Sequence, residues 1–139
     1  MGRILAIDYG KKRTGIAVTD VLQLIANGLT TVPTNELLAF LLDYVSREPV
    51  DKIIIGQPKQ LNNEDSDNMK NISPFVQSLS AKLNIPIEFF DERFTSVIAH
   101  RAMIDGGLKK KARQNKELVD EISATIILQS YLESLKFRH

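Results

Sequence analysis

The stretch RILAIDYGKKRTGIAVT, residues 3–19, decides the fold because it predicts a β-hairpin at the start of the chain. Arg3–Tyr9 and Thr14–Thr19 are short, apolar and rich in residues that favour strands. Gly10–Arg13 lies between them and supplies the residues of a turn. Two antiparallel strands joined by a tight, basic turn are therefore expected.

After the hairpin, the hydrophobic pattern changes from the period of a strand to that of a helix. A third strand is expected over Leu24–Val32, with a break near Asn27-Gly28. From Asn35 onward, apolar residues recur every three or four positions, so Asn35 is the expected N-cap and Pro49 the expected stop of a helix.

The remainder of the chain alternates between strand and helix patterns. Val50–Gly56 resembles a strand that is buried on both faces, as central parallel strands are. The next amphipathic pattern contains Pro74, so the helix either begins near Ser73 or is kinked there. The later expected elements are a strand over Ile85–Glu92, a helix over Thr95–Ile104 ended by Gly106-Gly107, and a final helix over Glu117–Lys136.

This order of elements predicts an α/β fold. Three meandering antiparallel strands, followed by alternating helix and strand, give a central mixed five-stranded sheet flanked by helices. The chain has 139 residues, which suits a single domain spanning 1–139.

Composition narrows the class of protein. Hydrophobic residues make up 43% and charged residues 25%, which is ordinary for a folded domain. Cysteine is absent, which excludes disulfides, zinc-thiolate sites and thiol nucleophiles. No apolar run is long enough for a signal peptide or a membrane span, so a cytoplasmic protein without membrane contact is expected.

Three acidic positions are candidates for chemistry. Asp8 shares one face of the first strand with Ile4 and Ala6, although it could simply form the turn. Asp91-Glu92 ends a strand, where functional groups gather in open α/β sheets, although it could be surface charge paired with Arg93. Asp120 lies on an otherwise apolar helix face, although the helix dipole alone also favours an acid there.

Together, these acids favour a metal site. Carboxylates gathered in one pocket repel one another unless a cation neutralises them, and Mg²⁺ or Mn²⁺ prefers oxygen ligands. Two basic clusters accompany the acids and suggest a phosphate-binding surface. One cluster is Lys11, Lys12 and Arg13, and the other, read as a mobile basic flap, includes Lys109, Lys110, Lys111 and Arg113.

Four ordered sequence blocks resemble the YqgF family, the Holliday junction resolvase-like proteins assigned to maturation of the 16S ribosomal RNA precursor. The first block, DYGKKRTGIA at residues 8–17, matches the family signature D-x-G-x-x-R-x-G-x-A. The later blocks are GQP at 56–58, DERFTS at 91–96 and VDEISA at 119–124. The sequence departs from the family pattern in the loop Leu61–Asn68, which lacks glycine, and at Ser123, where alanine is usual.

The resemblance implies an RNase H-like fold and a nuclease that depends on Mg²⁺ or Mn²⁺. It implies that Asp8, Glu92 and Asp120 are the catalytic and metal-binding residues, with Asp91 as a neighbour. It also implies that Arg13 and Arg93 hold phosphates or orient the acids. Hydrolysis by water would leave 5′-phosphate and 3′-hydroxyl ends, as in RNase H-like enzymes.

Alternative functions remain open at this stage. The substrate could be pre-rRNA or branched DNA, as for a Holliday junction resolvase, and the chain could be a monomer or a homodimer. Sugar kinases and actin-like ATPases also open with D-x-G, but they clasp a nucleotide between two such domains, and this chain has room for one. A non-catalytic nucleic-acid-binding module for ribosome assembly is the third possibility.

Overall fold

The computed structural model of the chain describes residues 2–57, 69–92 and 116–136, and the side chains of residues 116–119 lie outside that description. Five strands form one sheet in the order β3-β2-β1-β4-β5. Their bounds are β1 Arg3–Asp8, β2 Arg13–Thr19, β3 Ala26–Pro33, β4 Val50–Gln57 and β5 Ile87–Asp91. β2 runs antiparallel to both of its neighbours, β1 and β3, whereas β4 runs parallel to β1 and β5 runs parallel to β4, so the predicted mixed sheet is confirmed.

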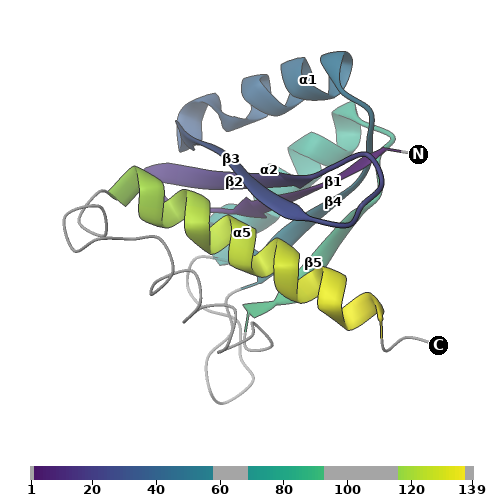
Figure 1. The fold of residues 1–139 in the computed structure, drawn as a ribbon. Coiled ribbons are helices and arrows are strands. Elements are labelled where there is room, and N and C mark those ends of the chain that lie inside the picture. The colour runs from purple at the N-terminus through teal and green to yellow at the C-terminus, as the bar shows by residue number, and fades with distance from the viewer. Residues whose placement is uncertain (1, 58–68, 93–115, 137–139) are drawn as a thin grey trace.

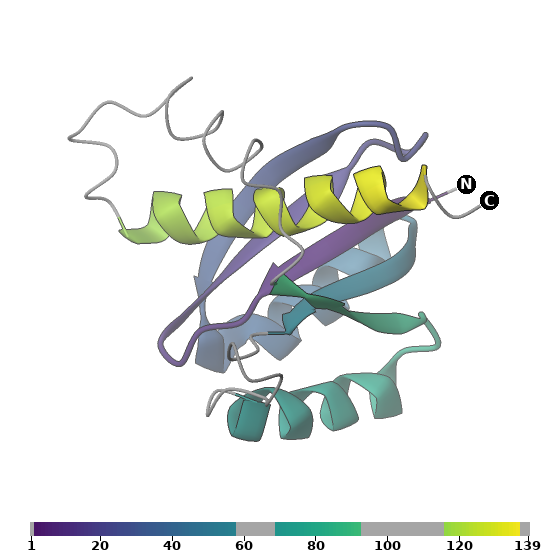
Figure 2. The same cartoon turned by 90° about the horizontal axis from the view of Figure 1, so that it is seen from below.

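Helices cover both faces of the sheet (Figures 1 and 2). On one face lie α1, Leu37–Arg47, and α2, Met69–Lys82; on the other lies α5, Lys116–Leu135. A short 3-10 helix, η1, spans Thr34–Glu36 before α1. Among the described helices, none combines the length and apolar character that crossing a bilayer requires.

Alternation along β1 explains why the sheet has two cores. Leu5 and Ile7 pack into a cluster with α1 and α2, whereas Ile4 and Ala6 pack into a second cluster with α5. A strand sends successive side chains to opposite faces, so β1 needs apolar residues at every position to be buried on both sides. Asp8 is the first polar residue in this series, and its position places it on the α5 face.

The expected start of the third strand was wrong by two residues. Leu24 and Ile25 belong to the turn before β3, because the Asp20 carboxylate accepts their backbone N–H groups at 2.9 and 2.8 Å. The break expected near Asn27-Gly28 corresponds to an irregularity in the pairing. Ile16 pairs with Thr30 while Ala17 pairs with Gly28, which leaves Leu29 as an extra residue.

The expected cap of the first helix was also wrong. Asn35 lies inside η1, and Glu36 precedes α1 without a side-chain capping hydrogen bond. The physical reason lies at Thr34. Its backbone N–H and hydroxyl both donate to carbonyl oxygens of the β1–β2 turn, and these bonds hold the chain in the 3-10 turn η1 before α1 begins. Pro74, left undecided by the sequence, lies inside α2, which begins at Met69.

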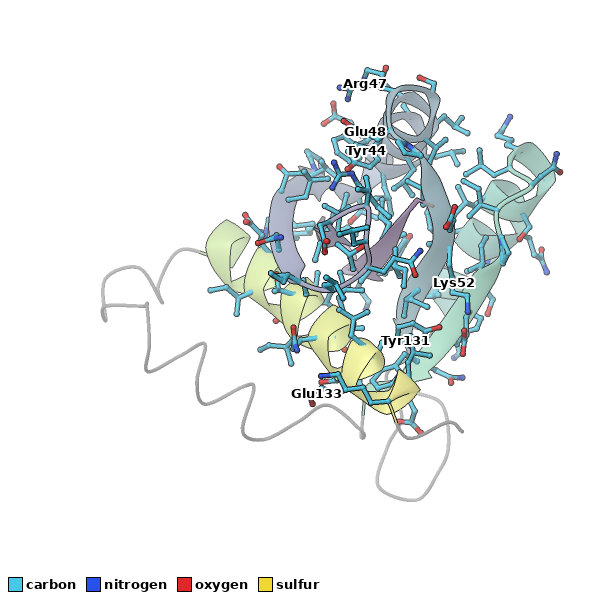
Figure 3. All side chains as sticks on the ribbon, turned by 45° about the vertical axis from the view of Figure 1, so that its right-hand side comes forward. Tyr44, Arg47, Glu48, Lys52, Tyr131 and Glu133 are labelled. Carbon is cyan, nitrogen blue, oxygen red and sulfur yellow. The ribbon has the colours of Figure 1, made fainter. Side chains whose placement is uncertain are left out.

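A polar contact fastens the far part of α5 to the sheet. Lys52 on β4 donates to Glu88 on β5 at 3.0 Å and to the Tyr131 hydroxyl on α5 at 2.9 Å. Figure 3 shows Lys52 and Tyr131 side by side between the sheet and the helix. Lys52 lies near the start of β4, so this contact anchors α5 at the end of the sheet away from Asp8.

Candidate active site

Asp8 ends β1 and pairs with Gly15 on β2. Its side chain is half-buried, in contrast to the fully buried apolar residues that precede it on the same face. Because Ile4 and Ala6 of this face pack against α5, the Asp8 side chain lies on the side of the sheet that α5 covers.

Asp120 is brought to Asp8 by an unusually close approach of helix and strand. It lies near the start of α5, on the face that also carries Ala124, Ile127 and Tyr131, and those three are fully buried as predicted. A Cβ on Gly15 would collide with the backbone oxygen of Asp120. Since Gly15 is the pairing partner of Asp8, the absence of a side chain there lets Asp120 reach the neighbourhood of Asp8.

Glu92 comes from the other side of Asp8. It directly follows β5 and lies over β4, where a Cβ on Gly56 would be 3.2 Å from the Glu92 Cδ. The strand expected over Val50–Gly56 is confirmed and extends one residue further, through Gln57. β4 is the parallel neighbour of β1, so Asp8 lies between Glu92 and Asp120.

Glu92 and Asp120 both act electrostatically on Asp8. Burial raises the pKa of Asp8 from its ordinary 3.8 to about 7, and the negative charges of Glu92 and of Asp120 add to the rise. Burial also raises the pKa of Glu92, and the charge of Asp91 adds to it. A half-buried carboxylate between two other acids is costly when ionised, and a divalent cation would relieve that cost.

These raised pKa values predict a pH dependence of stability. An acid whose pKa is higher in the folded than in the unfolded chain stabilises the fold while protonated, and that contribution disappears as the pH rises from about 4 to about 7. For Asp8 the loss amounts to as much as about 4 kcal/mol. Urea unfolding in chelator at pH 5 and pH 8 measures it. Asp8→Asn should flatten this difference, and an equally steep pH dependence in the variant would contradict the prediction.

Basic residues border the acids on one side. Arg13 begins β2, and its Nε donates to the Asp120 Oδ2 at 3.2 Å. Lys11 and Lys12, in the turn before it, are exposed. The sequence predicted all three as nucleic-acid-binding residues, and the family resemblance also allowed Arg13 to orient the acids; the ion pair identifies Asp120 as the acid that Arg13 contacts. Arg93, Lys109, Lys110, Lys111 and Arg113 lie outside the described residues, as do the expected helix 95–104 and the loop 61–68.

The donor chemistry of the acids fits a hard divalent cation. Three carboxylates from β1, α5 and the end of β5 offer only oxygen ligands, as Mg²⁺ and Mn²⁺ prefer. Within residues 2–57, 69–92 and 116–136, however, no three acidic or histidine side chains are already arranged as ligands of one ion. Binding a cation would therefore require side-chain movement, and the Asp120 carboxylate would have to exchange its ion pair with Arg13 for the cation.

Comparisons with known proteins agree with this architecture. Residues 2–134 match the family described as RuvX, Holliday junction resolvase. A protein of Phocaeicola vulgatus is 74% identical over 138 residues, which is 99% of each chain, and one of Bacteroides thetaiotaomicron is 71% identical over 99% of this chain and 100% of its own length. Both carry the name "putative pre-16S rRNA nuclease".

Solved structures of low sequence identity share the fold. RuvC of T. thermophilus, in complex with a Holliday junction substrate, superposes with a TM-score of 0.59 at 15% identity and covers 96% of each chain. The Fowlpox virus resolvase, in a complex with Holliday junction DNA, has a TM-score of 0.59 at 14% identity and covers 96% of this chain and 98% of its own. The predicted RNase H-like fold is thereby confirmed.

Proposed function

Because the chain belongs to the RuvX family of Holliday junction resolvases, we propose that it is a nuclease that hydrolyses phosphodiester bonds in structured nucleic acid with a divalent cation. We further propose that its substrate is the precursor of 16S ribosomal RNA, processed at the 5′ end in the cytoplasm. The support is that relatives which are 74% and 71% identical over nearly their whole length are named as pre-16S rRNA nucleases. A four-way DNA junction is the second candidate substrate, since the family description names it.

The observation that carries the proposal is the position of Asp8. A half-buried carboxylate whose pKa is raised to about 7, with two further acids contributing to the rise, is costly to the fold once it ionises. Such perturbed groups mark functional sites more often than structural ones. A cation site explains why the protein keeps an acid that is costly to ionise, because the attraction between a bound cation and the three carboxylates would offset that cost.

Residues of the chain then take the following roles. Asp8, Glu92 and Asp120 would hold Mg²⁺ or Mn²⁺, with Asp91 beside them. The bound ion would activate water and neutralise charge that develops on the phosphate. The basic residues of the β1–β2 turn and the start of β2 would bind phosphate oxygens and position the nucleic-acid backbone over the acids; they are Lys11, Lys12 and Arg13. Arg93 would contribute a further positive charge next to Glu92.

The proposal is tested with a labelled fragment spanning the 5′ end of the 16S rRNA precursor and a four-way DNA junction. Each is incubated with the protein in Mg²⁺, in Mn²⁺ and in chelator. We expect cleavage of the RNA fragment that requires either cation and leaves 5′-phosphate ends. Cleavage of the junction alone would favour the second substrate, and cleavage of either substrate in chelator would refute the cation-dependent mechanism.

The second basic cluster leads to a separate prediction. We propose that Lys109, Lys110, Lys111 and Arg113 bind phosphates, because no acid interrupts residues 106–116. Changing the three lysines to glutamine should weaken nucleic-acid binding and reduce the slope of log affinity against log salt by about 2–3. Fluorescence anisotropy over a salt series measures this slope.

A matched control for that triple variant exists in the described part of the chain. Lys70, Lys82 and Lys136 are exposed on α2 and just beyond α5. Their replacement by glutamine removes the same net charge, but it should leave the slope within about 0.5 of the wild type. Equal slopes for the two triple variants would mean that residues 109–111 act only through net charge, which would exclude them from the binding surface.

A further inference from the structure

The ion pair between Arg13 and Asp120 joins the two kinds of residue that the proposed reaction needs. The Arg13 Nε lies 3.2 Å from the Asp120 Oδ2, and the two side chains are 36% and 28% exposed. Arg13 belongs to the basic turn, and Asp120 belongs to the three acids. A cation that binds Asp120 and a phosphate that binds Arg13 would therefore each have to break this ion pair.

The backbone at both ends of this ion pair is held in place. Asp120 lies directly against Gly15, in contact through its backbone. The turn before Arg13 is tied to Thr34, whose backbone N–H donates to the Lys12 oxygen at 2.9 Å and whose hydroxyl donates to the Gly10 oxygen at 2.6 Å. The pair can thus separate by side-chain rotation, with no movement of β2 or α5.

The strength of the pair suits an exchange. Partly exposed ion pairs are screened by solvent and contribute little to stability, so a divalent ion that gains several carboxylate ligands can displace one guanidinium. The guanidinium, once released, lies beside Lys11 and Lys12 on a fixed turn and can bind a phosphate in bidentate fashion.

We propose that Arg13 is the exchangeable counterion of Asp120, and that its displacement by a divalent cation frees it to bind the nucleic-acid phosphate. The inference rests on the proposed function, since it concerns how the same acids and the same substrate are used. Its consequence is thermodynamic coupling: the cation should strengthen nucleic-acid binding, and nucleic acid should strengthen cation binding by the same factor.

The first experiment measures cation binding alone. Free Mn²⁺ is titrated by electron paramagnetic resonance against the wild type, Arg13→Met and Lys12→Met. We expect Arg13→Met to bind Mn²⁺ about tenfold more tightly, because the competing counterion is gone. Lys12→Met removes the same charge from the same turn, but Lys12 pairs with no acid among the described residues, so the expected change is less than about threefold. Weaker Mn²⁺ binding by Arg13→Met would overturn the proposal.

The second experiment measures coupling with nucleic acid. Affinity for the RNA fragment is measured in chelator and in Ca²⁺, which takes oxygen ligands as Mg²⁺ does and serves as a probe for binding. We expect Ca²⁺ to raise wild-type affinity about tenfold and to leave Arg13→Met nearly unchanged. Equal gains in both proteins would overturn the role of Arg13 while leaving the nuclease proposal intact. A wild type that binds neither Mn²⁺ nor Ca²⁺ would overturn both.

Discussion

Asp8→Asn is expected to reduce cleavage roughly a thousandfold while the protein remains folded, and to be more stable than the wild type in chelator at pH 8. Asparagine has nearly the shape of aspartate but cannot carry the charge that would hold a cation between Glu92 and Asp120. The same loss of charge removes the cost of an ionised, half-buried carboxylate whose pKa is about 7. Single-turnover cleavage and urea unfolding on one preparation measure both effects.

The opposite signs of these two effects make the test specific. A variant that merely misfolds loses activity and stability together, whereas a ligand that is costly to the fold loses activity and gains stability. Asp43→Asn is the matched control, because Asp43 is an exposed acid on α1 that forms an ion pair with Arg47, one turn away. It should cleave at the wild-type rate. Full activity in Asp8→Asn, or reduced stability at pH 8, would contradict the assignment of Asp8.

The parts of the site that could be predicted from the sequence depend on local periodicity. Alternation along β1 placed Asp8 on the face of Ile4 and Ala6, and helical spacing placed Asp120 on the face of Ala124. Ile4, Ala6 and Ala124 share one core cluster, and the charge of Asp120 raises the pKa of Asp8, which agrees with both placements. These predictions succeed because a strand and a helix impose fixed directions on their side chains. They require no knowledge of which elements become neighbours.

What could not be predicted depends on contacts between distant elements. The ion pair of Arg13 and Asp120 joins residues 107 positions apart, and no local sequence pattern predicts which acid Arg13 contacts. Nothing in the sequence singles out Thr34, although its hydroxyl donates to the Gly10 oxygen in the turn that precedes Arg13. A long-range tie of this kind also explains why Asn35 does not cap the helix, since tertiary hydrogen bonds take precedence over local capping preference.

Glycine 15 illustrates the same limit and gives the second large prediction. In the sequence, Gly15 matches a glycine of the family signature, but the signature does not say what this glycine contacts, and within a strand glycine normally weakens pairing. In the structure it is the point at which α5 crosses β2, and a Cβ would collide with the backbone oxygen of Asp120. A backbone atom cannot rotate away as the end of a side chain can. Gly15→Ala should therefore push the start of α5 off the sheet.

The expected cost of Gly15→Ala is about 2–4 kcal/mol of stability in urea unfolding, together with roughly a hundredfold loss of cleavage, because Asp120 is displaced by about an ångström relative to Asp8. Gly28→Ala is the control in the neighbouring strand, since the atoms nearest to its Cβ would be the Oε1, Cγ and Cδ of Glu121, a flexible side chain that can turn away. It should cost less than about 1 kcal/mol and little activity. If the two alanine variants were equally stable and equally active, the close crossing of α5 over β2 could not be what brings Asp120 to Asp8.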